Sequence, residues 1–272
     1  MTLIELKSVS GSCGEGAVKD VSFRLPNGKT YGVFSPSYAD SVALLALMSG
    51  ARTPTGGTVL AGGFDLHREA KQARRGIGYL AADLLPDGEL TPIEYLMSVA
   101  DARELNYDKT VRYVHELLEL ADLADKKESL IANLSHVEKR ALCLLQVLLG
   151  KPEILILTSP LSGILPKDAP KIRELIKYFG DTYTIFLCTP RSQDLVEMCD
   201  EIIVLQDGML KSVVPAQDES LAEVFATATV KAPEAPEADE QKSARASAIW
   251  KMLTQKSEDY EVLQNDEKED KN

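Results

Sequence analysis

The stretch that decides the fold is K-T-Y-G-V-F-S-P-S-Y-A-D-S-V-A-L-L-A-L-M-S-G, residues 29–50. It begins with an apolar segment of strand length, Lys29 to Phe34, and ends with an apolar run of helical length that is expected to open at Asp40 or Ser41. A tight turn joins the two. Strand, tight turn and helix in this order form the framework of a phosphate-binding loop.

The residues that give such a loop its chemistry are replaced here. A working loop, G-x-x-x-x-G-K-[ST], needs glycines so that backbone N–H groups can approach phosphate, a lysine for the β- and γ-phosphates, and a hydroxyl for Mg²⁺. The residues at these positions are Ser35, Tyr38 and Asp40 for the glycines, Ser41 for the lysine, and Val42 and Ala43 for the hydroxyl pair. At a separation of about 4 Å and an effective dielectric constant of about 20, the carboxylate of Asp40 would repel a phosphate by about 4 kcal/mol before screening by salt. Two interpretations remain open: a phosphate loop without its function, or an ordinary strand-to-helix turn with Asp40 or Ser41 as N-cap.

Composition limits the classes of partner. The chain has 272 residues, 44% of them hydrophobic, which is enough for a sizeable core, and its net charge of −12 argues against nucleic acid or an anionic lipid surface as partner. The longest apolar stretch, residues 141–149, is too short to span a membrane, and the N-terminus carries no signal-peptide pattern. We therefore expect a cytoplasmic protein without direct membrane insertion.

Cysteine and histidine do not point to a metal or disulfide site. The four cysteines form no C-x-x-C pair, and Cys143 and Cys188 lie in apolar segments, so they are expected to be buried free thiols. The three histidines are isolated in the sequence. We assign no metal-ligating residue.

The order of the remaining elements predicts an α/β fold. Strands are expected at 2–8, 19–25, 58–61, 76–80, 153–157, 183–188 and 201–205, and helices at 67–75, 91–105, 108–121, from Ser135, at 167–178 and at 193–199. Thr91 and Ser135 are predicted N-caps, and Glu138 completes a capping box. Continuous apolar strands that alternate with helices imply a parallel sheet covered on both faces, and the alternating N-terminal strands imply an antiparallel layer.

The chain is expected to divide into a main domain and a C-terminal extension. Residues 1–213 form the domain, with a helical insert at about 84–149, and residues 214–230 form a short helical extension. Residues 231–272 begin as a Pro/Ala/Glu linker and end in an acidic tail that is expected to be flexible. Between them, 243–254 has one apolar helical face that either binds a partner or folds back on the domain.

Several segments in order carry a resemblance to a known family. They are V-S-F-R-L-P-N-G-K-T-Y-G-V-F (21–34), P-T-G-G-T-V-L-A-G-G-F-D-L (54–66), I-G-Y-L-A-A-D (77–83), E-L-T-P-I-E-Y-L (89–96), L-S-H-V-E-K-R (134–140), P-E-I-L-I-L-T-S-P-L-S-G-I-L-P (152–166) and C-D-E-I-I-V-L-Q-D-G-M-L (199–210). From Leu3 to about Lys211 the chain resembles the ATP-binding subunit of an ABC transporter of the exporter-like branch. The resemblance implies a core of the P-loop NTPase type.

The same resemblance implies that the residues of the ATP site are lost. The family's Q-loop Gln is Ala81 or Ala82, its Walker B Asp and Glu are Thr158 and Ser159, its D-loop Asp is Leu165, its switch His is Pro190, and Cys13 lies near the place of the aromatic that stacks on adenine. In the signature motif Ser135 remains, while His136 and Val137 replace the glycines and Glu138 adds a negative charge. We therefore assign no catalytic and no cofactor-binding residue, and expect neither tight Mg-ATP binding nor hydrolysis.

Three functions follow from the resemblance. The first is a pseudo-ATPase scaffold or regulatory subunit for a membrane permease or an active ABC subunit, peripheral to the inner face of the membrane, with Ala82 to Tyr95 lining the groove for the permease. The alternative is a subunit that binds and hydrolyses Mg-ATP at an atypical site, using the hydroxyls of Ser37, Ser41 and Thr158 and a cation from Lys139 or Arg140. The third is a soluble ABC protein acting on ribosomes or DNA. It is disfavoured because such proteins usually carry two ATP-binding domains in one chain, whereas this chain has one and is acidic.

Overall fold

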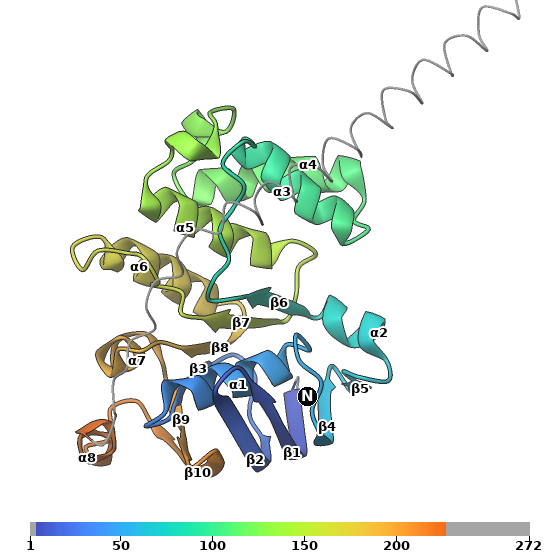
Figure 1. Ribbon diagram of the computed structural model, residues 1–272. Helices are drawn as coiled ribbons and strands as arrows, with labels where there is room; N and C mark the ends of the chain where they lie inside the picture. The colour runs from blue at the N-terminus through green and yellow to red at the C-terminus, as the bar shows by residue number, and fades with distance from the viewer. Residues whose placement is uncertain (1–3, 227–272) are drawn as a thin grey trace, which may run out of the picture.

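The computed structural model describes residues 4–226, which form two sheets and the helices packed on them (Figure 1). The predicted linker, the helix at 243–254 and the acidic tail lie outside these residues. The final element within them is helix α8 (Ser220–Ala226).

The larger sheet is six-stranded and mainly parallel. Its order is β10-β9-β3-β8-β7-β6, with bounds β3 Thr30–Phe34, β6 Ile77–Leu80, β7 Ile154–Thr158, β8 Thr184–Cys188, β9 Glu201–Gln206 and β10 Met209–Pro215. Strands β6, β7, β8, β3 and β9 pair in parallel, and β10 runs antiparallel to β9. Every residue of β3, β7 and β8 is buried, because both faces of the sheet are covered. The predicted parallel sheet is confirmed.

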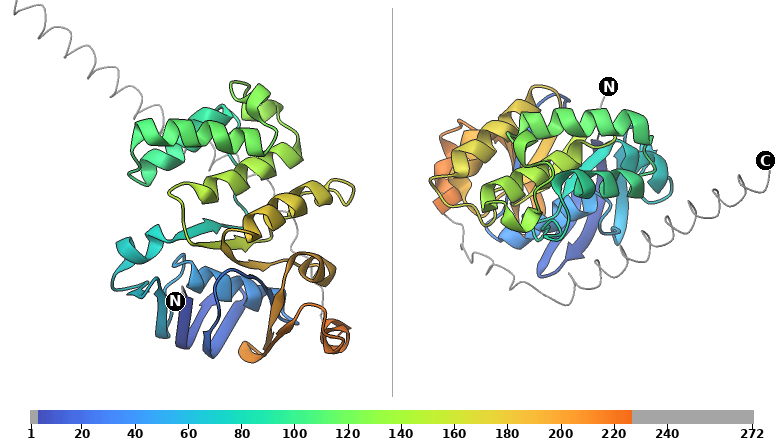
Figure 2. Two further views of the ribbon diagram at one scale, coloured as in Figure 1. Left: turned by 180° about the vertical axis from the view of Figure 1, so that it is seen from behind. Right: turned by 90° about the horizontal axis from the view of Figure 1, so that it is seen from above.

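The smaller sheet is the predicted antiparallel layer, and helix α1 (Tyr38–Met48) lies between the two sheets (Figures 1 and 2). The order of its strands is β2-β1-β4-β5, with bounds β1 Ile4–Cys13, β2 Gly16–Arg24, β4 Gly56–Ala61 and β5 Phe64–Asp65. Leu44 and Leu45 of α1 share one buried cluster with Val21 of the small sheet and Phe186 of the large one. This position explains why α1 is apolar around most of its circumference.

Further helices cover the opposite face of the large sheet. They are α3 Pro92–Ala102, α4 Tyr107–Leu120, α5 His136–Leu145, α6 Ala169–Gly180 and α7 Ser192–Met198, with the 3₁₀ turns η1 Ala124–Lys126, η2 Ile131–Asn133 and η3 Gln146–Leu148, while α2 Ala70–Arg75 precedes β6. Along β7, Ile154 and Ile156 pack toward the α1 side, and Leu155 and Leu157 toward the α5 and α6 side. The period of two in a strand thus divides one sheet between two cores.

Two predicted helix caps are confirmed and one is wrong. The hydroxyls of Thr91 and Ser135 each accept a hydrogen bond from the third helical residue, and that residue's carboxylate accepts one from the cap's own N–H, so both form capping boxes. Helix α1, however, begins at Tyr38 with Ser37 as the N-cap residue, not at Asp40 or Ser41. The cause is tertiary, since the carboxylate of Asp40 is bonded to strand β2.

The cysteines are free thiols, and Cys143, Cys188 and Cys199 are buried. Burial raises the pKa of the Cys143 thiol to about 11 and that of Cys188 to about 12. Because these folded-state values lie above the value of 9.0 for an exposed thiol, the protonated form is favoured by folding. The resulting stability is fully present below about pH 9 and is lost as the pH rises toward the folded-state values.

This burial predicts both a labelling pattern and an alkaline instability. In native protein at about pH 8, Ellman's reagent is expected to modify the half-exposed Cys13 rapidly, and the three buried thiols only after unfolding. The free energy of unfolding, measured with urea, is expected to be lower at about pH 10.5 than at about pH 8. Rapid native-state modification of Cys188 would contradict the packing around β8.

Candidate functional site

The predicted phosphate loop lies between β3 and α1, at the carboxyl ends of the parallel strands, where ligands bind in open α/β sheets. There the structure brings Tyr38 to the ends of two other strands. The Tyr38 hydroxyl forms a short hydrogen bond with the hydroxyl of Ser159, the residue that follows β7. The thiol of Cys188, the last residue of β8, donates to the Tyr38 oxygen at 3.6 Å. One phenol therefore ties the loop to two strands.

Tyr38, Ser159 and Cys188, which we call the Tyr38 group, carry no charge. Burial raises the pKa of the Tyr38 phenol well above its usual range, and the Cys188 thiol beside it raises it further. Both side chains therefore stay protonated at neutral pH. Since Ser159 is also neutral, this group offers hydroxyl and thiol hydrogen bonds but no charge.

Two further predicted site residues, Ser41 and Thr158, are also neutral and each only 1% exposed. The hydroxyls of Ser41 and Thr158 have no hydrogen-bond partner among the described residues. Thr158 ends β7, and burial raises the pKa of the neighbouring Tyr79 phenol. The positions predicted to correspond to the family's lysine and magnesium-binding aspartate thus carry two buried hydroxyls.

Asp40 is engaged by the antiparallel layer. One carboxylate oxygen accepts a hydrogen bond of 3.0 Å from the backbone N–H of Ala17 in β2, and the other accepts one of 3.2 Å from the Ser35 hydroxyl. Beside this contact, Gly16 packs directly against the loop, where a Cβ would overlap the carbonyl of Ala39. The β1–β2 hairpin therefore closes on the start of α1, and the predicted charge at Asp40 serves to hold it.

The close packing at Gly16 predicts a selective loss of stability. Gly16→Ala places a methyl group against backbone atoms that cannot yield, so we expect a loss of about 1–3 kcal/mol in the free energy of unfolding. The matched control is Gly56→Ala in β4, where a Cβ meets only the Ser10 side chain at 4.0 Å. Urea unfolding of both variants measures the difference, and equal stabilities would show that the hairpin does not press on the loop.

The signature position at the start of α5 does not join the Tyr38 group. The Ser135 hydroxyl donates to a Glu138 carboxylate oxygen at 2.9 Å, and that oxygen also accepts from the Ser135 N–H at 2.8 Å. Lys126 forms an ion pair with the other oxygen. Although burial alone would raise it, hydrogen bonds from Lys126 and Ser135 hold the pKa of Glu138 below its ordinary value. The retained serine is therefore occupied as a helix cap, and a carboxylate lies beside it.

The two cations proposed for an atypical site are bound to backbone carbonyls. Arg140 is 5% exposed, and its guanidinium donates to the carbonyls of Ser159 and Pro160, the latter at 2.8 Å. Lys139 donates to the carbonyl of Ala132 at 3.0 Å. Both hold the start of α5 to neighbouring segments.

The remaining predicted positions lie on separate segments. Ala82 follows β6, Cys13 ends β1, Val42 is in α1, and Leu165 is exposed between β7 and α6. The methyl group of Ala82 has no atom that can bind a metal or water. Within residues 4–226 no cluster of His, Cys, Asp and Glu is arranged to hold a metal ion.

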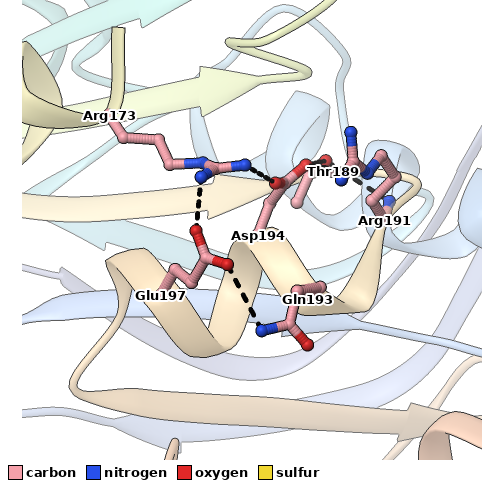
Figure 3. A network of polar contacts seen from close by, with 6 residues as sticks. All are labelled: Arg173, Thr189, Arg191, Gln193, Asp194 and Glu197. Carbon is pink, nitrogen blue, oxygen red and sulfur yellow. Dashed lines mark hydrogen bonds and ion pairs between the residues drawn. The ribbon is translucent and has the colours of Figure 1, made fainter. Parts of the chain in front are cut away.

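Beside Pro190, the structure contains a buried ionic network that sequence reasoning missed (Figure 3). Its centre is Asp194 in α7, which is 1% exposed and accepts from Arg173 of α6 at 2.8 Å. The other members are Thr189 at 3.4 Å and Arg191 at 3.7 Å from Asp194, Glu197 paired with Arg173, and Gln193 at 3.3 Å from Glu197. The spacing of Asp194 and Glu197 on one helical face was the available signal. The network fixes the loop that carries Pro190.

Comparisons with known proteins agree with this architecture. A family model described as ABC transporter matches residues 18–162. The Nod factor export ATP-binding protein I of Rhizobium meliloti is 30% identical over 207 residues, covering 75% of this chain and 62% of the relative. The linearmycin resistance ATP-binding protein LnrL of Bacillus subtilis is 27% identical over 197 residues, covering 72% of this chain and 63% of the relative. The chain thus spans less than two thirds of the length of both.

A solved structure supports the fold. The crystal structure of a nucleotide-free ATP-binding cassette from an ABC transporter superposes with a TM-score of 0.69 at 16% identity, covering 86% of this chain and all of the other. Because the family model matches more than half of the residues, the chain belongs to the ABC transporter family, as a relative of its ATP-binding proteins.

Proposed function

We propose that the chain is a pseudo-ATPase, an ABC-type scaffold that contributes assembly or regulation to a transporter instead of nucleotide chemistry. The observation that carries this proposal is the hydrogen bond between Tyr38 and Ser159. It joins the loop to the end of β7, between the two motifs that hold phosphate and Mg²⁺ in the family. A nucleotide would have to break this bond and displace the partly buried ring of Tyr38.

The donor set does not fit Mg-ATP. Mg²⁺ is bound through carboxylates and substrate phosphates, but Thr158 and Ser159 are neutral. Phosphate is bound by cations and free N–H groups, but Ser41 is neutral and Asp40 is negative. The space for a phosphate at the predicted loop is also narrowed, because Gly16 packs against the carbonyl of Ala39. We derive no catalytic step through ATP.

The alternative, an atypical ATP-hydrolysing subunit, is favoured by one observation. The buried hydroxyls of Ser41 and Thr158 both lack partners among the described residues, which a polar ligand would supply. Against it, the Arg140 guanidinium is only 5% exposed and already donates to two backbone carbonyls, and Lys139 donates to a third. The pseudo-ATPase accounts for more of the geometry.

The proposed partner is a membrane permease, met at the inner face of the membrane. Residues 4–226 contain no helix of sufficient length and apolarity to span a bilayer, so such a chain would reach the membrane through its partner. In the stretch Ala82 to Tyr95, Leu85 is 70% exposed, which suits a side chain that a partner covers. The names of the relatives associate them with export or resistance, which is compatible with such a partner.

Co-purification from the membranes of the producing organism tests the proposal. The tagged chain is expected to retain a multispanning permease or an ABC subunit, identified by mass spectrometry, and Leu85→Asp is expected to lose it. Tyr178→Asp, which changes another exposed apolar side chain on α6, is the matched control and should retain the partner. Recovery of no permease and no ABC subunit with the unaltered chain would remove the basis of the proposal.

A further inference from the structure

A cleft of ≈ 700 Å³ lies between the end of α1, α2, β6 and the end of α3. Its lining includes four basic residues, Lys71, Arg74, Arg75 and Arg103, and one acidic residue, Glu104. This excess of positive charge stands out in a chain whose net charge is −12. The cleft is therefore suited to an anionic occupant.

The basic groups are held in position but keep donors free. Arg74 donates to the carbonyl of Gly50 at 2.9 Å, and Arg103 to the carbonyl of Leu149 at 2.6 Å. A guanidinium has five N–H donors, so each retains others for a ligand. Lys71 pairs with Glu104 at 2.8 Å, whereas Arg75 forms no ion pair with any residue between 4 and 226.

The wall of the cleft is partly apolar. Ile77 and Leu149 are buried there, and Leu105 and Tyr79 are half-buried. A small inorganic anion would leave the exposed parts of Leu105 and Tyr79 uncovered. The cleft therefore calls for a peptide that carries both carboxylates and apolar side chains.

We propose that the acidic segment at residues 258–270 of this same chain, E-D-Y-E-V-L-Q-N-D-E-K-E-D, binds in this cleft. It combines carboxylates for the basic rim with Tyr260, Val262 and Leu263 for the apolar wall. The roughly 30 residues between Ala226 and this segment have an extended reach on the order of 100 Å, which imposes no obstacle to contact. The occupant thus matches the cleft in charge, in apolar content and in reach.

The consequence goes beyond the pseudo-ATPase assignment. Binding of a permease to the same cleft rests on the proposed function. If the cleft does receive part of a permease, the acidic segment and the permease compete for one surface. Because the attraction acts between exposed charges, it weakens as salt rises. Docking would then be regulated by the chain's own C-terminal region.

Zero-length carbodiimide cross-linking of the full chain tests the contact. Amide bonds between Lys71 and carboxylates of residues 258–270 are expected at about 0.02 M NaCl and lost at about 0.5 M, as mapped by mass spectrometry. Arg75→Glu is expected to lower their yield about fivefold, and Glu261→Lys in the same chain to restore it. Arg112→Glu, which reverses an exposed charge on α4, should have no effect.

Because the Lys71 amine already lies 2.8 Å from Glu104, an amide between these two competes with the cross-link to residues 258–270, so the folding of each variant is checked separately by circular dichroism. If Arg75→Glu and Arg112→Glu give equal yields of the cross-link between Lys71 and residues 258–270, the proposed contact is overturned. An absent tail cross-link in a chain that still captures a permease overturns it while the scaffold function stands. A salt-sensitive, Arg75-dependent cross-link in a chain that captures no permease supports the contact and counts against the scaffold function.

Discussion

Isothermal titration of the full chain with Mg-ATP is expected to give no binding heat, and a phosphate-release assay on the same sample no turnover above background. The physical reason is the absence of charge where phosphate and metal require it: Ser41 and Thr158 are neutral and buried, and Asp40 is negative. The loop is also closed by the bond between Tyr38 and Ser159. Nucleotide would have to displace these contacts without forming an ion pair in return.

Thermal denaturation gives an independent measurement. A ligand at about a hundredfold excess over its dissociation constant stabilises the folded state by about 2.7 kcal/mol, so a micromolar site would raise the melting temperature clearly in millimolar Mg-ATP. AMP is the matched control, because it has the adenosine but lacks the β- and γ-phosphates. Stabilisation by Mg-ATP but not by AMP, together with released phosphate, would favour the atypical ATPase and overturn the pseudo-ATPase.

Asp194→Ala is expected to lower the free energy of unfolding by about 3–5 kcal/mol, a larger loss than that expected for Gly16→Ala. The replacement removes the carboxylate that joins Arg173 and Arg191 and leaves a largely buried guanidinium with Glu197 alone. Breaking a buried ion pair in this way costs more than the pair contributes, because one charge stays uncompensated. Urea unfolding monitored by circular dichroism gives the value.

A double variant separates this cause from simple loss of packing. Arg173→Met combined with Asp194→Leu removes both charges, so it is expected to cost less than Asp194→Ala alone. Gln193→Ala, on the same helix, should change stability by no more than about 0.5 kcal/mol. If the double variant proves the least stable of the three, the network stabilises by its own attraction and the explanation by an orphaned charge is wrong.

Most of the fold was predictable because its signals are local. Continuous apolar runs marked β3, β7 and β8, the Thr91-Pro92 pair marked an N-cap, and hydroxyl–carboxylate spacing marked the capping box at Ser135. Such patterns depend only on residues within one strand or one helical turn, so they can be recognised without knowing the tertiary contacts of the chain. The identity of the residue at each predicted motif position is likewise read directly from the chain.

The partners of those residues were decided only by the tertiary structure. Asp40 was a predicted helix cap, but its carboxylate accepts a hydrogen bond from the N–H of Ala17 in strand β2 of the small sheet. Helix α1 therefore begins earlier, at Tyr38. The partner of Tyr38 is Ser159, 121 positions away, and no local pattern encodes that pairing. Sequence alone therefore determined the elements, their order and the family, because short-range periodicity and residue identity suffice for these. The closure of the loop required the folded chain, because it depends on which distant groups burial brings within hydrogen-bonding distance.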